Sequence, residues 1–305
     1  MEKNLKKIKW ARLSILSNTC LIIMKVIVGI ITGSLAIIAE SIHSFIDLLA
    51  SFITFFAVKE SSQPADKDHQ FGHAKFEDLS GLIEAFLIIG TAFFIIHESI
   101  PKVIKPEELK FIDSAITVMF VSAVVNFFVS RKLYKISHET DSIALEADGA
   151  HLLIDVYTSL GVMLSMVIIR ITNLFILDPI ISISIAIYII IIGIKISLKS
   201  IKNLVDEGIT NENIEDIKKI INNHTKSISS FHKLATRKAG NITMIDVHLQ
   251  FNGEESVKKA HEISHLIQTD LTKKFLNTRI MIHIEPCKDN CSECYVENCS
   301  ERKII

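Results

Sequence analysis

Two histidine–aspartate pairs lie inside apolar segments of the chain, where charged side chains are rare. His43 and Asp47 form one pair, and His151 and Asp155 form the other, each with i, i+4 spacing. On a helix this spacing puts both side chains on one face, one turn apart. A charged group at the centre of a membrane span costs about 2.5–3.5 kcal/mol by insertion scales, so such residues need a functional reason.

The four side chains together form a suitable ligand set for a divalent metal ion. Two imidazole nitrogens and two carboxylate oxygens complete the tetrahedral shell that zinc prefers. Two carboxylates neutralise a divalent cation, whereas the empty site would hold two negative charges in a low dielectric and attract protons. This gives a physical basis for exchange of metal for protons. The competing interpretation, a local helix hydrogen bond within each pair, must explain the same spacing in two separate segments.

The elements that must position these pairs are long apolar helices. The chain has 305 residues, of which 49% are hydrophobic, and its mean hydropathy is +0.38. A helix needs about 20 mostly apolar residues to cross about 30 Å of hydrocarbon. We therefore predict an α-helical membrane protein with six spans, at residues 13–32, 35–58, 79–97, 112–130, 144–170 and 179–198.

The charge distribution predicts the orientation and excludes one class of partner. The 33 basic and 34 acidic residues nearly cancel, and no basic patch with interleaved aromatic residues is present, so we expect no nucleic-acid partner. Lysine and arginine are concentrated in the amino-terminal segment, in the loops at 59–78 and 131–143, and after the last span. This bias predicts a multi-pass protein of the inner or plasma membrane with both termini in the cytoplasm. The loop at 99–111, on the other side, also carries three lysines and weakens the bias.

The last third of the chain is polar and reads as a small soluble domain. We expect a helix at 212–226, strands at 231–238 and 242–251, a helix at 255–275 and a strand at 279–285. The order αββαβ predicts a small α+β domain of ferredoxin-like type, with helices packed on a sheet. The domains expected are a six-helix transmembrane domain at 1–205, a cytoplasmic regulatory domain at 206–286 and a cysteine-rich tail at 287–305.

The tail contains four of the five cysteines, and two interpretations of them stay open. Disulfides are not expected on the cytoplasmic side of a membrane. The thiolates could bind zinc or another soft metal, or the tail could be unstructured. The residues concerned are Cys287, Cys291, Cys294 and Cys299.

Several segments resemble those of a known transporter family. They include residues 33–36 (GSLA) and 39–44 (AESIHS), residues 147–151 (ADGAH), and the loop at 63–75 (QPADKDHQFGHAK). With these motifs the chain resembles the cation diffusion facilitator family, in its bacterial zinc and ferrous-iron efflux branch. The resemblance implies a homodimer that spans the lipid bilayer six times and exports a divalent metal ion in exchange for protons. It makes His43, Asp47, His151 and Asp155 the transport site.

The resemblance also implies a metal site in the loop between the second and third spans. Its ligands would be Asp66, His69 and His73. Three ligand-type side chains within eight residues are suggestive by themselves, although a solvated polar loop could hold them without binding a metal. A further implication is an ion pair between Lys75 and Asp206, which would tie the third span to the end of the sixth near the dimer seam.

In the small domain, five residues match positions where family members bind a pair of zinc ions. Alternation along a strand puts His248 on the face opposite Val247, and puts His283 and Glu285 on one common face. Surface histidines without a metal are the simpler interpretation. The full set is His232, His248, His261, His283 and Glu285.

The nature of the metal and the functional class follow from the same residues. Some members of the branch have Asp where His43 stands, and an imidazole there favours zinc over manganese, magnesium or calcium. We therefore expect zinc as both the transported and the structural metal, with iron or cadmium as alternative substrates. A membrane metal sensor or storage protein without transport is a second class. A membrane hydrolase is a third, but four protein ligands leave no open position for catalytic water.

Overall fold

The structure is a computed structural model that describes residues 2–32, 35–104, 112–172, 176–224, 227–275 and 277–287. The side chains of some helical residues, those of 35–43 among them, lie outside this description. The chain divides into two compact units, residues 1–202 and 203–305. Each unit is considered by itself.

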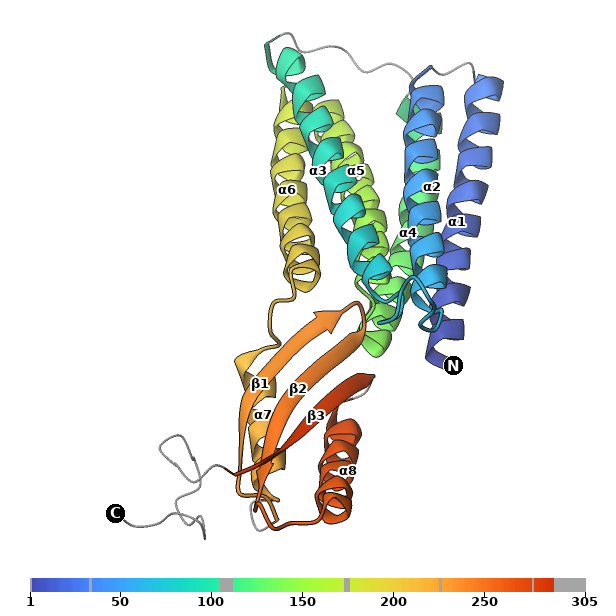
Figure 1. Cartoon of the computed structure of the whole chain (residues 1–305). Coiled ribbons are helices and arrows are strands. Elements are labelled where there is room, and N and C mark those ends of the chain that lie inside the picture. Colours follow the sequence, from blue (N-terminus) through green and yellow to red (C-terminus); the bar gives the residue numbers. More distant parts are fainter. Residues whose placement is uncertain are drawn as a thin grey trace. The chain divides into compact units, whose positions relative to one another are not determined.

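The described part of the first unit consists of six long helices (Figure 1). Three of them are long and apolar enough to cross a membrane, over Asn4–Val28, Lys75–Ile104 and Pro179–Leu204. All six predicted apolar segments therefore form helices. Within the residues described, three of these six helices have the length and the composition needed to cross a membrane. The helices are α1 (Glu2–Thr32), α2 (Leu35–Ser61), α3 (Lys75–Ile104), α4 (Ile112–Thr140), α5 (Ile143–Thr172) and α6 (Leu177–Leu204).

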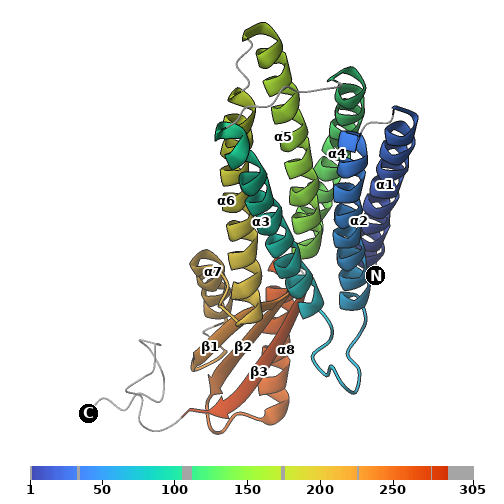
Figure 2. The same cartoon turned by 90° about the horizontal axis from the view of Figure 1, so that it is seen from above.

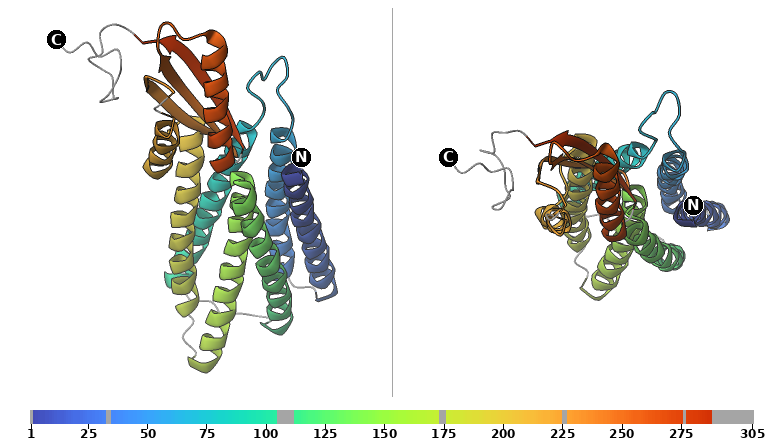
Figure 3. Two further views of the ribbon diagram at one scale, coloured as in Figure 1. Left: turned by 90° about the horizontal axis from the view of Figure 1, so that it is seen from below. Right: turned by 60° about the horizontal axis from the view of Figure 1, so that its bottom comes forward.

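Helix α5 lies in the middle of the bundle. It packs against α4, α2 and α3, and Figures 2 and 3 show it between the α3–α6 pair and the group formed by α1, α2 and α4. Gly161 of α5 faces Ile185 of α6, whose Cδ1 atom would lie 2.1 Å from a Cβ atom built at that position. Side chains on α5 therefore reach several neighbouring helices at once.

A buried polar group joins three helices and the residue just before α5, at the end of the bundle where α2 finishes and α5 begins. Lys7 of α1 and Glu77 of α3 form an ion pair, with side chains only 1% and 0% exposed. The Glu77 carboxylate also accepts hydrogen bonds from Ser61, at 2.8 Å, and from Ser142. Because all three partners come from different segments, this carboxylate fixes the ends of the helices relative to one another.

The second unit has the predicted order αββαβ. It comprises α7 (Asn211–Asn222), β1 (Ser230–Ala239), β2 (Ile242–Phe251), α8 (Val257–Lys274) and β3 (Thr278–Pro286). Strand β2 lies in the middle of the sheet, antiparallel to β1 and parallel to β3, and α8 makes the crossover that a parallel pair requires. The first helix ends at Asn222 instead of 226, because the apolar spacing stops at Ile221.

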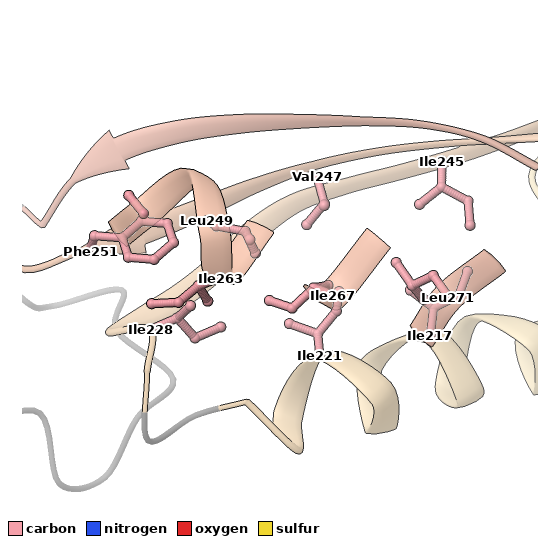
Figure 4. Packing of buried hydrophobic residues seen from close by; sticks show 11 residues of the cluster. Ile217, Ile221, Ile228, Ile245, Val247, Leu249, Phe251, Ile263, Ile267 and Leu271 are labelled. Atoms are coloured by element: carbon pink, nitrogen blue, oxygen red, sulfur yellow. The ribbon is translucent and has the colours of Figure 1, made fainter. Parts of the chain in front are cut away.

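Both helices of this unit cover one face of the sheet. Figure 4 shows apolar side chains of α7 and α8, among them Ile221 and Ile267, directed at Val247 and Leu249 of β2. A β-bulge between His232 and Ala235, with Lys233 at φ 50°, interrupts the alternation of β1. The bulge lets Phe231 and Leu234, three positions apart, both pack against this core. The opposite face of the sheet is left to polar residues.

Candidate metal centres

The first centre lies inside the helical bundle, between α2 and α5. Asp47, His151 and Asp155 offer ligand atoms that all lie within 4.8 Å of one another. His151 Nε2 is 2.9 Å from Asp47 Oδ1, and the two residues are only 6% and 5% exposed. Three of the four residues predicted for the transport site are thus brought together. His43 belongs to α2, but its side chain lies outside the described part of the structure.

A third helix supports this centre through a residue that the sequence did not single out. Asn126 of α4 is buried and donates its amide Nδ2–H to Asp155 Oδ2 at 3.3 Å. This contact orients one of the two carboxylates, as outer-shell partners commonly do in metal sites. In the sequence, Asn126 stands out only as an amide side chain within an apolar segment, and this does not indicate which residue it contacts.

The second centre is formed by the loop between α2 and α3. The ligand atoms of Asp66, His69 and His73 lie within 4.8 Å of one another. Asp66 Oδ2 is 3.2 Å from His73 Nε2, and the centroids of the two imidazole rings are 4.4 Å apart. His73 is buried, and its Nδ1 is 3.1 Å from the carbonyl oxygen of Pro64, which fixes the ring. All three predicted loop ligands are therefore brought together.

Backbone hydrogen bonds within the loop favour the negatively charged form of Asp66. Its Oδ1 accepts the backbone N–H groups of His69, at 2.6 Å, and of Asp68, at 2.9 Å. These hydrogen bonds, led by that of His69, hold the pKa of Asp66 below its ordinary value, so that the ionised form is favoured. Glu60 Oε1 lies 3.9 Å from His73 Nε2 and is a further oxygen near the centre that the sequence did not indicate.

The third centre lies on the polar face of the sheet in the second unit. Neighbouring strands place His232 opposite His248, and His248 opposite His283. The ligand atoms of His232, His248 and Glu285 lie within 4.8 Å of one another. Glu285 bridges the set, with Oε1 2.5 Å from His232 Nε2 and Oε2 3.3 Å from His248 Nδ1. His283 Nε2 is 3.9 Å from the same Oε2.

Glu285 is poised as an anion in this centre. Partial burial raises its pKa, but hydrogen bonds from His248 and Gln250 and the charges of the nearby histidines outweigh that effect, and the pKa lies below its ordinary value. His261 does not belong to this group within the chain. It is exposed on α8, and α8 packs on the opposite face of the sheet.

Two other predicted features are seen only in part. The backbone N–H of Cys287 donates to the carbonyl of Phe251 at 2.7 Å, while Cys291, Cys294 and Cys299 lie outside the described residues. Asp206 pairs with Arg237 at 3.0 Å, within the second unit. Lys75 begins α3 in the first unit, so its predicted pairing with Asp206 stays a prediction.

A buried carboxylate–imidazole group among long apolar helices, followed by a sheet domain with its own ligand group, defines a metal-binding membrane protein. The profile of the cation efflux transmembrane domain matches residues 11–205, and that of the cation efflux protein cytoplasmic domain matches residues 209–287. The chain belongs to this family, the cation diffusion facilitators, whose members are transporters and not enzymes.

Relatives of similar length support the assignment. Protein p34 of Rickettsia prowazekii is 30% identical over 278 residues, covering 90% of this chain and 90% of the relative. The cation-efflux pump FieF of Shewanella oneidensis is 28% identical, over 90% of this chain and 93% of the pump. A solved structure of CzrB in its zinc form is 29% identical and covers 27% of this chain and 92% of that chain, with a TM-score of 0.26.

Proposed function

We propose that this chain exports a divalent metal ion, zinc before other metals, from the cytoplasm in exchange for protons. The observation that carries the proposal is the buried group of Asp47, His151 and Asp155, whose ligand atoms lie within 4.8 Å of one another. With His43 as the fourth ligand, the set would supply two nitrogens and two oxygens, which suits tetrahedral zinc.

The contact between His151 and Asp47 supports coupling of metal and proton movement. His151 Nε2 lies 2.9 Å from Asp47 Oδ1, a distance at which the two atoms share a proton. A nitrogen that holds a proton has no lone pair for a metal, so zinc must displace that proton before it can be bound there. In a membrane with a proton gradient, alternating access to this group would load metal on one side and protons on the other.

The remaining predictions complete the proposed transporter. It crosses the inner or plasma membrane six times with both termini in the cytoplasm, and it works as a homodimer. Residues 1–205 move the ion, residues 206–286 bind regulatory zinc through the sheet histidines, and the Lys75–Asp206 pair ties the third span to the end of the sixth near the dimer seam. The loop centre binds a further metal ion. For the cysteines of residues 287–305, a thiolate site and an unstructured tail both stay open.

Uptake into proteoliposomes under an imposed pH gradient tests the function. We expect zinc to accumulate only when the gradient is present, and Asp47→Ala and Asp155→Ala each to reduce the flux at least about 100-fold, since each removes a ligand with a charge. Glu262→Ala, an exposed carboxylate of α8, is the matched control and should retain the flux. Zinc flux that persists in both site variants, or that ignores the gradient, would rule out this function.

The identity of the metal is tested by His43→Asp. Replacing a nitrogen by an oxygen ligand makes the site harder, so the ratio of manganese flux to zinc flux should rise about tenfold. The measurement is a competition between zinc, iron, cadmium and manganese in the same vesicles. An unchanged order of the four metals would show that His43 does not set the selectivity.

A further inference from the structure

The helical bundle contains a second pair of buried carboxylates, apart from the three metal centres. Glu84 of α3 is 0% exposed, and Asp148 of α5 is 2% exposed. Oε2 of Glu84 and Oδ2 of Asp148 have no hydrogen-bond partner among the described residues. Buried polar atoms without a partner are rare in folded proteins, and a buried carboxylate oxygen without one calls for a cation or a proton.

Among the described residues, the hydrogen bonds to these two carboxylates come from hydroxyl groups. Thr54 donates its hydroxyl to Glu84 Oε1, and Ser51 donates its hydroxyl to Asp148 Oδ1 at 3.2 Å. Asn18 of α1 in turn donates its amide to Ser51 Oγ at 2.8 Å. The result is a compartment of hydroxyl, amide and carboxylate groups contributed by four helices.

The compartment lies one helical turn from the transport group. Ser51 follows Asp47 by four residues in α2, and Asp148 precedes His151 by three residues in α5. Going from Asp47 to Ser51 along α2 and from His151 to Asp148 along α5 leads toward the same end of the bundle. At that end, Ser61 of α2 and Ser142 just before α5 both contact the carboxylate of Glu77. Glu84 accepts a hydrogen bond from Thr54, and Asp148 accepts one from Ser51. These two donors are three positions apart in α2, so both carboxylates lie along the same face of that helix.

The charges of the bundle exceed what one metal ion can neutralise. Asp47 and Asp155 balance one divalent cation, so Glu84 and Asp148 remain as two further carboxylates in a low-dielectric interior. Among the described residues, their neighbours are hydroxyls and the His151 ring, and no lysine or arginine forms an ion pair with them. A second cation would supply the missing charge.

We propose that Glu84 and Asp148 form an oxygen-only binding position for a divalent cation, on the path between the transport group and the end of the bundle where α5 begins. The proposal rests on the proposed function, because it gives the same transported ion a second binding position. Carboxylates and hydroxyls without nitrogen or sulfur bind zinc less firmly than a site with imidazoles. Weak binding allows the ion to leave for the transport group.

Binding of Mn²⁺ to the purified full-length protein tests the position directly. Mn²⁺ suits oxygen ligands, and its free form is counted by electron paramagnetic resonance. In a background of Asp47→Ala with Asp155→Ala, the transport group is removed. We expect this background to bind about one more Mn²⁺ ion per chain than the same protein with Glu84→Gln and Asp148→Asn added. Equal counts in the two proteins would overturn the proposal.

Transport kinetics provide a second readout in otherwise unaltered protein. Glu84→Gln and Asp148→Asn should each raise the apparent KM for zinc at least about fivefold, with the saturated rate changed less than about twofold. Glu98→Gln, an exposed carboxylate of the same α3 helix, should leave KM unchanged. If either neutral variant does not fold, Ser51→Ala replaces it, with a smaller rise in KM expected. An unchanged KM in the folded variants would argue against the binding position.

The two proposals fail in distinguishable ways. If zinc flux survives in the Asp47→Ala and Asp155→Ala background, the proposed function fails whatever the Mn²⁺ count. If flux is lost there while the Mn²⁺ counts are equal, only the position at Glu84 and Asp148 is disproved.

Discussion

His151 Nε2 on α5 lies 2.9 Å from Asp47 Oδ1 on α2, although 104 residues separate them in the chain. The contact joins two helices through the same atoms that a metal ion would use. In the proposed transporter a proton would occupy this contact when no ion is bound, and it would have to leave before a metal is bound there.

Zinc binding should release protons from this contact. When zinc is added to purified protein in weak buffer, we expect His151→Ala and Asp47→Ala each to release about one proton per chain less than the unaltered protein. A pH-indicator dye measures the release. His265→Ala, an exposed histidine of α8, is the control. Equal release from His151→Ala and the unaltered protein would mean that metal and proton do not compete at His151.

The pH dependence of metal binding at the sheet centre should not come from Glu285. Its pKa is lowered, so the carboxylate is already ionised throughout pH 5–8 and loses its charge only below its ordinary range, about 4.3. Within pH 5–8 histidines are the side chains that ordinarily change charge. We expect Glu285→Gln to weaken zinc binding about tenfold without moving the midpoint of its pH dependence.

Equilibrium dialysis of the full-length protein across this pH range measures both quantities. Glu254→Gln, an exposed carboxylate before α8, is the control for a change of charge alone. A midpoint that shifts by a unit or more in Glu285→Gln would assign the titration to that carboxylate instead.

The ion pair of Lys7 and Glu77 should be essential for stability of the bundle. Glu77→Gln leaves the Lys7 ammonium buried without a counter-charge, which typically costs about 3–5 kcal/mol. Thermal inactivation in detergent should show the loss, and Lys7→Met combined with Glu77→Leu should recover most of it. The exposed pair of Lys6 and Glu139 is the control, and Glu139→Gln should have no measurable effect. Equal behaviour of Glu77→Gln and Glu139→Gln would contradict this.

The core of the cytoplasmic domain should be sensitive to truncation. Ile267 is 0% exposed between α7 and β2, so Ile267→Ala should destabilise the domain by about 2–5 kcal/mol. Val257 is 82% exposed at the start of α8, and Val257→Ala should change stability by less than about 0.5 kcal/mol. Native-state hydrogen exchange of β2 amides measures both in the full chain. Similar protection in the two variants would contradict the packing.

Periodicity predicted most of the elements. Apolar runs located the helices of the first unit, and alternation in residues 242–251 located β2 and put Val247 and His248 on opposite faces, as the structure confirms. The i, i+4 pairs located a ligand group because polar residues inside apolar helices are costly and therefore informative.

Other features depend on contacts between distant segments and left no pattern in the sequence. Asn126, which supports Asp155, is a single amide in α4 whose partner is 29 residues away. The bulge at Lys233 breaks alternation where a strand was predicted to be regular. Glu84 is a carboxylate within the apolar helix α3, and its relation to Asp148 depends on the packing of α3 against α5.

The parallel pairing of β2 with β3 has a consequence for biosynthesis. His232 and His248 lie on the two strands that are made first, while Glu285 lies on β3, which follows α8. A ribosome must therefore complete the crossover helix and the third strand before the three ligands can meet. The sheet centre is thus unavailable to metal in a nascent chain that stops at α8, and a chain truncated before β3 would leave the edge of β2 without its parallel neighbour.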